Sequence, residues 1–347
     1  MNFIVSLKIR GAPWTPPDPL KEYKRRGRSV STVMRTLKPV RQKRSVRRKE
    51  ILSRWQLYLF LLLPLAYIIV FAYVPMAGLQ LAFKKFSPRL GIWGSPWVGL
   101  DQFTKFFKSY MFERVLKNTI RVSLYSLIAG FPIPIIFALL LNSMRNYKFK
   151  RSIQMITYIP HFISTVVLVG MVLQMINPRI GLFGMLYRAL AGSDLPNLIG
   201  MPKAFSHLYV WSGVWQGLGW GSIIYISALA SVDSELHEAA EIDGASRFQR
   251  VRFIDFPSIL PTATIMLILN SGQIMNVGFE KVFLMQNGLN LRASEVISTY
   301  VYKVGIASST QDFSYATAIG LFNSVINFAL ICLVNSFSKR VSDNRLW

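Results

Sequence analysis

Residues 55–75 read WQLYLFLLLPLAYIIVFAYVP and contain no Lys, Arg, Asp or Glu. A helix needs about 20 apolar residues to cross the hydrocarbon core of a bilayer, so this stretch alone predicts a membrane anchor. The rest of the chain agrees, because 52% of its 347 residues are hydrophobic and only 16% are charged. The apolar residues come in long blocks, unlike the periodic pattern of a soluble domain. The sequence therefore predicts a polytopic membrane protein.

Six apolar blocks predict six transmembrane helices. They cover residues 55–74, 118–141, 156–176, 208–230, 260–277 and 315–337. Because a backbone in hydrocarbon must satisfy its own hydrogen bonds, these blocks indicate an all-α bundle. We expect Pro75 to end the first span, and Pro132 and Pro134 to kink the second. The fifth span is the weakest, since the polar run 270–273 interrupts it.

The positive charge is concentrated before the first span. The formal net charge is +24, and residues 1–54 hold 16 Lys/Arg against Asp18, Glu22 and Glu50. Such a tail could bind nucleic acid. A basic segment that holds the amino terminus in the cytoplasm is the preferred reading, so no nucleic-acid partner is expected. The Pro-rich start predicts a largely disordered tail, and the first apolar run begins too late for a cleavable signal peptide.

The six spans and the charge bias together predict the topology. A cytoplasmic start places both termini in the cytoplasm, with 26 Lys/Arg on that side and 14 on the outer side, as the positive-inside rule requires. The expected organisation is a cytoplasmic tail (1–54), a six-span domain (55–337) and a short cytoplasmic tail (338–347). The polar loop 231–258, between the fourth and fifth spans, then faces the cytoplasm.

This loop has the signals of a rigid helix-turn-helix. Asp233 or Ser231 can cap a helix over residues 234–242. Leu236, Ala239 and Ala240 then share one face, on which the two alanines allow a partner backbone to approach closely. The pair at 243–244 breaks the helix, and a second helix over 245–254 is expected to stop before Pro257.

The residues of this loop also match a family motif. Glu238, Ala239 and Ala240 are followed by Gly244, and then by Ile254 and Pro257, with Phe256 where Leu is usual. This spacing resembles the EAA loop of ABC importer permeases, which docks on a cytoplasmic ATPase. The resemblance implies that Glu238, Ala239, Ala240, Asp243 and Gly244 transmit ATP-driven closure to the spans. The alternative is an ordinary solvated amphipathic loop.

Further segments resemble carbohydrate importer permeases, in particular the subgroup for oligosaccharides and polysaccharide fragments that includes the alginate importer. These segments are VGLDQF (98–103), WQGLGW (215–220), GFEK (278–281) and FSYATA (313–318). The resemblance implies a multi-pass subunit of the bacterial cytoplasmic (inner) membrane. It also implies a second, different permease chain, two ATPase subunits that carry ATP and Mg²⁺, and an external solute-binding protein.

Neutral polar and aromatic residues within the spans suit a sugar, which offers hydroxyls at its edges and C–H bonds on its faces. The candidate pathway residues are Trp215, Gln216, Trp220, Asn270, Asn323 and Asn327. The alternative is that these amides join helices to one another. The basic outer loops favour an acidic, alginate-like oligosaccharide. They could equally meet an acidic binding protein or lipid headgroups.

Catalytic motifs are missing from the sequence. It contains no Gly-Lys pair and hence no P-loop, and the His237-Glu238 helix has Glu241 where a zinc protease has its second His. Cys332 is the single cysteine, so no disulfide framework is expected. We expect no catalytic residue, metal or cofactor on this chain. Two alternatives to a sugar permease stay open: an ABC permease for a non-sugar solute, and a polytopic scaffold or enzyme.

Overall fold

A computed structural model describes residues 54–341, which form helices joined by turns and loops, with an isolated bridge between Lys84 and Trp97. The all-α prediction is therefore confirmed for this part of the chain. The predicted basic tail, apart from Arg54, and residues 342–347 lie outside the described residues. The chain divides into two units, residues 1–72 and 73–347. The first contains α4 (Trp55–Ile68) and most of the π-helical turn η1 (Ile69–Tyr73).

The first predicted span is longer than expected. Helical residues continue from Trp55 to Phe83, through α5 (Val74–Met76) and the 3₁₀ segment η2 (Ala77–Phe83). The prediction that Pro75 ends the helix is wrong. Pro75 lies in the first turn of α5, directly after a π-helical turn, where a missing N–H is tolerated.

The second span is confirmed and extended. It comprises α8 (Tyr110–Gly130) and α9 (Pro132–Asn142), with Ser109 as an N-cap whose hydroxyl accepts from Met111 N at 3.2 Å. The assigned helix is interrupted only at Phe131, immediately before Pro132. Phe131 keeps helical φ and ψ, so the two prolines interrupt the helix without reversing its direction.

The third predicted span is not one straight helix. The chain forms α10 (Tyr147–Tyr158), the 3₁₀ turn η3 (Ile159–Phe162) and α11 (Thr165–Met175), and α10 and α11 meet at 104°. Pro160, the second residue of the 3₁₀ turn, lacks an N–H donor, and the Ser164 hydroxyl caps α11 by accepting from Val167 N. An apolar run cannot reveal such a bend.

The remaining helices are α6 (Gly91–Gly94), α7 (Asp101–Lys108), α12 (Leu182–Ala191), α13 (Pro202–Ala230), α14 (Ser234–Ile242), α15 (Arg247–Arg250), the π-helical η4 (Val251–Asp255), α16 (Phe256–Ser271), α17 (Phe279–Met285), α18 (Leu291–Ser294), α19 (Ile297–Tyr302), η5 (Lys303–Ala307) and α20 (Phe313–Val341). Of these, α13, α16 and α20 correspond to predicted spans with different ends and α14 to the predicted loop helix, while several short helices lie outside the predicted blocks. The fifth span therefore ends at Ser271, not at Val277, because the polar run after Leu269 ends the helix.

Four helices between residues 54 and 341 are long and apolar enough to cross a membrane, or five if the bent pair is one span. They are Trp55–Phe83, Tyr110–Asn142, Arg247–Ser271 and Phe313–Ser336. The fourth predicted span corresponds to α13, which has 29 residues but is not among them, since Trp, Ser and Gly dilute its apolar residues.

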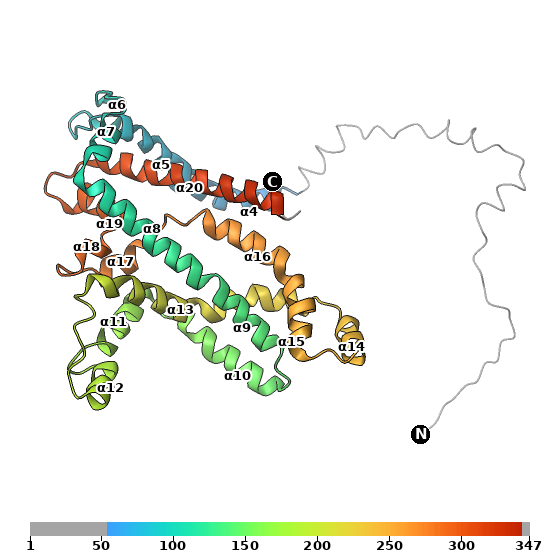
Figure 1. Cartoon of the computed structure of the whole chain (residues 1–347). Helices are drawn as coiled ribbons and strands as arrows, with labels where there is room; N and C mark the ends of the chain where they lie inside the picture. The colour runs from blue at the N-terminus through green and yellow to red at the C-terminus, as the bar shows by residue number, and fades with distance from the viewer. Residues whose placement is uncertain (1–53, 342–347) are drawn as a thin grey trace, which may run out of the picture. The chain divides into compact units, whose positions relative to one another are not determined.

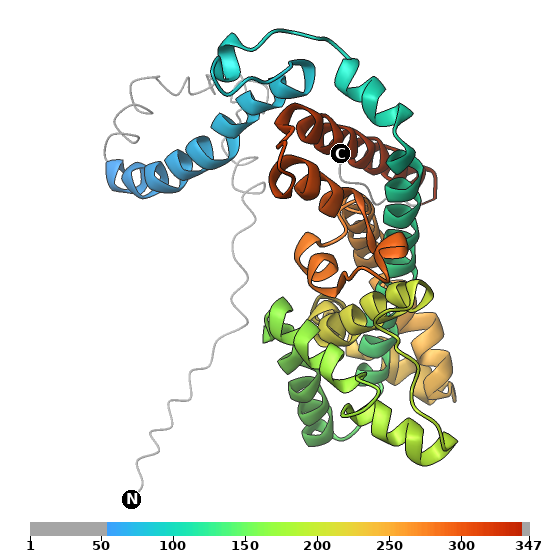
Figure 2. The ribbon, with the colours of Figure 1, turned by 90° about the vertical axis from the view of Figure 1, so that its left-hand side faces the viewer.

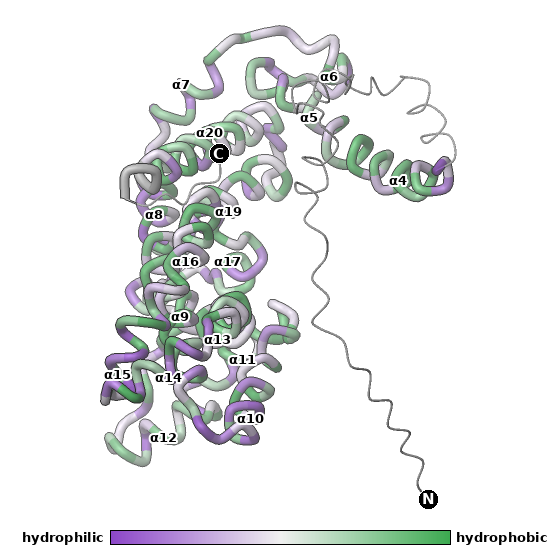
Figure 3. Tube along the Cα trace, turned by 90° about the vertical axis from the view of Figure 1, so that its right-hand side faces the viewer, coloured by the Kyte–Doolittle hydropathy of each residue, from purple (hydrophilic) through white to green (hydrophobic). Residues whose placement is uncertain are grey.

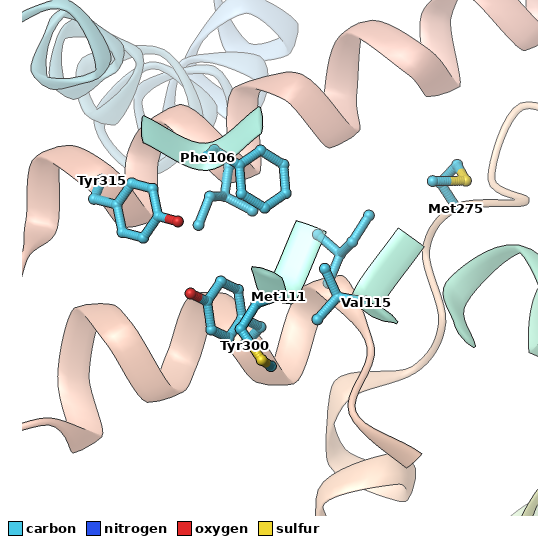
Figure 4. Close-up of a cluster of buried hydrophobic side chains, with 8 residues drawn as sticks. Phe106, Met111, Val115, Met275, Tyr300 and Tyr315 are labelled. Atoms are coloured by element: carbon cyan, nitrogen blue, oxygen red, sulfur yellow. The ribbon is translucent and has the colours of Figure 1, made fainter. Parts of the chain in front are cut away.

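Within residues 73–347, the long helices lie side by side and place their loops at two opposite ends (Figures 1 and 2). At one end, α9, α13 and α16 pack through Ile135, Tyr225 and Ile259, next to the connection that carries α14. At the other end, α7, α8, α19 and α20 share a core around Phe106 and Tyr315 (Figure 4). The fold thus separates the two kinds of candidate site.

Candidate coupling loop and translocation cavity

Helix α14 begins where the sequence predicts. The Asp233 carboxylate accepts from Glu235 N at 3.0 Å, so Asp233 is the cap, whereas the Ser231 hydroxyl bonds Ala228 O within α13. Glu235 adds an acid in the first turn, where the helix dipole favours it. The predicted helix over residues 234–242 is confirmed.

A glycine closes this helix. Gly244 has φ +77°, and its N–H donates to Glu241 O at 3.1 Å, while Ala245 N donates to Ala240 O at 2.8 Å. These two bonds form a Schellman motif, in which the residue after the cap is left-handed. The motif explains locally why a Gly stands four residues after Ala240.

The segment after the turn differs from the prediction. The Ser246 hydroxyl accepts from Gln249 N at 3.3 Å and Gln249 Oε1 accepts from Ser246 N at 2.7 Å, a capping box that starts α15. The helix then continues through η4 into α16, so the prediction that it stops before Pro257 is wrong. Pro257 lies just after a π-helical turn, which accommodates its missing N–H.

Figure 3 shows hydrophilic residues along α14 and α15, and most residues from 233 to 249 are exposed. The predicted coupling residues Glu238, Ala239, Asp243 and Gly244 are exposed, and Ala240 is half-buried. Large apolar side chains are exposed beside them: Leu236, Ile242 (86%) and Phe248 (72%). Exposed apolar groups between charges are typical of a protein interface.

Sequence reasoning missed a polar contact beneath α14. Asp255 is 3% exposed, and its Oδ1 lies 3.2 Å from His237 Nε2 and 3.2 Å from the Asn142 amide nitrogen. An ion pair between the half-buried Arg250 and the exposed Glu241, at 3.0 Å, joins α15 to α14 nearby. The sequence analysis considered His237 only as part of an incomplete zinc-protease motif, and no sequence spacing predicts its proximity to Asn142.

The amides of α20 meet a partner that sequence reasoning also missed. Asn276 Oδ1 accepts from Asn323 Nδ2 at 3.2 Å and from Asn327 Nδ2 at 3.0 Å. Asn327 Oδ1 accepts from Met275 N, while the buried Asn323 Oδ1 has no partner. The sequence signal that could have indicated this contact was Asn276, a third amide residue just after the polar run 270–273.

A cavity of about 340 Å³ adjoins these amides. Asn270 and Asn276 line it with polar groups from α8, α13 and the segment after α16; the full lining is Ser123, Ser126, Leu127, Gly130, Phe131, Tyr209, Asn270, Gln273, Ile274, Asn276 and Val277. None of these residues is charged. The cavity therefore offers hydroxyls and amides, which suit uncharged polar groups of a solute.

The structure separates the predicted pathway residues into two groups. Asn270, Asn323 and Asn327 gather around Asn276, whereas the three residues from α13 lie along the α10–α11 bend. Gln216 Nε2 donates to Ile163 O at 2.9 Å, and Trp220 stacks on His161 with ring centroids 4.4 Å apart. Trp215 lines a separate apolar cavity of about 500 Å³.

The basic groups of the predicted outer loops are partly neutralised. Four of them pair with acids: Lys105–Asp312, Lys117–Glu113, Arg188–Asp194 and Lys303–Glu295. Lys84 is buried and donates to two backbone carbonyls. Lys281, in α17, donates to Tyr209 O at 2.8 Å, and its burial lowers its pKa to about 8.

Residues 54–341 contain no group of three or more His, Cys, Asp and Glu side chains that could hold a metal ion. Together, the apolar helices, the neutral cavity between them and the exposed helix-turn at one end define a membrane transport component.

Comparison with known proteins gives the family. Residues 130–343 match the model of the binding-protein-dependent transport system inner membrane component. The chain is 40% identical to protein LplB of Bacillus subtilis over 295 residues, which are 85% of this chain and 92% of LplB. It is 36% identical to the polygalacturonan/rhamnogalacturonan transport system permease protein YteP of the same organism, over 86% of this chain and 92% of YteP.

Solved structures agree. A crystal structure of a bacterial ABC transporter involved in the import of the acidic polysaccharide alginate contains a chain with TM-score 0.77 and 35% identity, covering 85% of this chain and 98% of that chain. A crystal structure of a bacterial alginate ABC transporter in complex with an alginate pentasaccharide-bound periplasmic protein gives 0.78 and 34%, over 86% and 99%.

The chain belongs to the family of binding-protein-dependent transport system inner membrane components, the permease subunits of ABC importers. It is therefore a transport subunit, and the ATPase of such importers is a separate subunit. The ABC importer prediction is confirmed, and the alternative of a scaffold or membrane enzyme is set aside.

Proposed function

We propose that this chain is a permease subunit that imports an oligosaccharide, with an acidic, alginate-like uronate oligosaccharide as preferred substrate. The observation that carries the proposal is the match to the alginate importer chains at 34–35% identity over almost their whole length. The relative named for polygalacturonan and rhamnogalacturonan, which is 36% identical, supports the same class of substrate.

The proposed topology has six spans in the bacterial cytoplasmic membrane, with both termini in the cytoplasm. The bent α10–α11 pair supplies the third span and α13 the fourth, in addition to the four long apolar helices. The excess of Lys/Arg in the tail and in the loop after Asn142 supports this orientation.

In this orientation α14 is the proposed coupling helix. Glu238, Ala239, Ala240, Asp243 and Gly244 would contact one of two ATPase subunits, which hold the ATP and Mg²⁺. The exposure of Ile242 and Phe248 supports a protein partner at this surface. A second, different permease chain and an external solute-binding protein complete the proposed importer, and membrane lipid surrounds it.

The proposed pathway passes the cavity beside Asn276. The amide and hydroxyl groups that line it, such as Asn270, Asn276 and Ser126, can exchange hydrogen bonds with sugar hydroxyls. Trp215, Gln216 and Trp220 would guide the substrate along the α10–α11 bend. The cavity is neutral, so we assign the preference for acids to the outer loops, where Lys/Arg exceed Asp/Glu by 14 to 6.

One alternative substrate class has support. The chain is 25% identical to the sn-glycerol-3-phosphate transport system permease protein UgpA of Escherichia coli over 280 residues. Basic outer loops would also attract a phosphate ester. The higher identity to proteins named for polysaccharide fragments favours the oligosaccharide.

Transport assays in proteoliposomes test this proposal. The importer is reconstituted with its partner subunits, and uptake of a uronate pentasaccharide is compared with that of a neutral pentasaccharide and of glycerol 3-phosphate. We expect the uronate to be imported fastest. Faster uptake of glycerol 3-phosphate would overturn the substrate class, and equal uptake of both sugars would remove the preference for acids.

A variant tests the cavity. Asn276→Ala removes the acceptor of two amide donors, and losing a buried hydrogen-bond partner costs about 1–3 kcal/mol. We expect several-fold slower uptake with normal assembly. The matched control, Gln80→Ala, removes an amide of η2 that bonds Ala77 O. Equal uptake by both variants would argue against the Asn276 cavity as the pathway.

A further inference from the structure

A buried carboxylate joins three elements at the end of the molecule that carries α14. Asp255 closes η4, Asn142 ends α9, and His237 lies in the middle of α14. Asp255 Oδ1 accepts from the Asn142 amide at 3.2 Å, and His237 Nε2 lies 3.2 Å from the same oxygen.

This contact is important because few other interactions hold α14 against the rest of the protein. No residue of α14 is buried, so its apolar packing is slight. In the Arg250–Glu241 pair the arginine side chain is 17% exposed and the carboxylate side chain 59%, so water screens this ion pair from the Glu241 side. The contact of His237 with the buried carboxylate of Asp255 therefore connects α14 to the membrane helices.

The position of Asp255 follows from the backbone. A π-helical turn inserts one extra residue into a helix, and such turns are frequent at functional sites. Here η4 connects α15 to α16, and Asp255 at its end is buried while Phe253 remains exposed. Burying a carboxylate costs more than burying an apolar residue, so its use here indicates a need for directional bonds.

The surroundings show what else faces the pair. A cavity of about 290 Å³ beside it is lined by the cations Arg145, Arg247 and Arg250, by the acid Glu241, and by Ser143, Met144 and Val251. Arg250 partly offsets the charge of Asp255, while His237 and Asn142 contact its Oδ1.

We propose that His237, Asp255 and Asn142 are positioning residues that fasten the coupling helix to α9 and α16. A displacement of α14 by the ATPase then moves both spans together. This inference rests on the proposed role of α14. His237 and Asp255 touch neither substrate nor nucleotide, and they act by transmitting the movement of α14 to the spans.

Uptake per ATP hydrolysed, measured with the reconstituted importer, tests the link. His237→Ala breaks it and should lower this ratio at least five-fold, while the ATPase subunits still copurify. His237→Gln keeps an N–H donor at a similar reach and should retain most coupling. Ser152→Ala, which removes an exposed hydroxyl of α10 that bonds Lys148 O, is the control and should couple like the native chain.

His237→Ala leaves a buried charge with one fewer partner, so this variant could fail to fold. The double variant His237→Ala/Asp255→Asn removes that charge and should assemble normally, yet remain uncoupled because the link is still broken. Native coupling in the double variant, or in a folded His237→Ala, would overturn the inference.

The experiments distinguish the positioning role of His237, Asp255 and Asn142 from the proposed role of α14 as the coupling helix. If substitutions at Glu238 and Gly244 abolish ATPase binding while the double variant couples normally, only the positioning role fails. If Glu238 and Gly244 substitutions change neither ATPase binding nor coupling, the proposed role of α14 itself fails.

Discussion

Gly244 allows a direct test of the coupling loop, because replacing it should change only the backbone strain of the turn. Its φ of +77° is left-handed, and a Cβ added there would meet nothing within 4 Å. Substitution therefore costs backbone strain and creates no clash. An L-residue in this region costs about 1–2 kcal/mol, which corresponds to roughly 5- to 30-fold in the population of the closed turn.

We expect three variants to rank by their tolerance of this conformation. Gly244→Asn should behave almost like the native chain, because Asn adopts left-handed backbone most readily after Gly. Gly244→Ala should weaken ATPase binding several-fold, and Gly244→Val should weaken it most, since β-branched residues are rare at positive φ. The assay is titration of the detergent-solubilised permease with its ATPase, read as a dissociation constant.

The ranking is what tests the reasoning. If Gly244→Ala binds the ATPase as tightly as the native chain, the left-handed turn is not needed for docking. If Gly244→Asn is as defective as Gly244→Val, the defect comes from the added side chain at the interface and the strain argument is wrong.

Three further outcomes are expected. A Cβ at Gly219 would lie 2.3 Å from Thr157 O, so Gly219→Ala should lower the yield of folded protein by forcing α13 from α10, whereas Gly217→Ala, with open space, should not. In the native state the pKa of Lys281 is about 8, below its ordinary value of 10.5. Between these pH values the native state binds fewer protons than the unfolded state, so the thermal unfolding temperature in detergent should rise with pH across this window. Lys281→Met should reduce this pH dependence. Ser246→Ala should cost about 1 kcal/mol of local stability at the start of α15, seen as faster amide exchange there against unchanged exchange in α20.

The local features of the loop could be read from the sequence because they depend on neighbouring residues. Asp233 caps α14, Gly244 ends it, and both were predicted. The helix after Ser246 was misjudged because a π-helical turn accommodates Pro257, and nothing in the sequence announces that turn. The bend at Pro160 was missed for a similar reason, since apolar residues continue through it.

Contacts between distant segments could not be predicted. Asn323 and Asn327 were proposed from their spacing on one helix, but their meeting with Asn276 depends on how α20 packs against the segment after α16. The hydrogen bond between Asn142 and Asp255 joins residues 113 positions apart in the sequence. The structure therefore adds the cavity and the positioning link, whereas the motif residues and the family follow from sequence.

The central claim is that α14 contacts the ATPase, and site-specific cross-linking tests it directly. Cys332 is the single cysteine, so Cys332→Ser gives a cysteine-free background. Ala239→Cys places a thiol on exposed α14, and Thr310→Cys places one on the exposed loop at the opposite end. We predict that only the Ala239→Cys chain cross-links to the ATPase in membranes, with a yield that changes when ATP is added. Cross-linking from Thr310→Cys but not from Ala239→Cys would contradict the account.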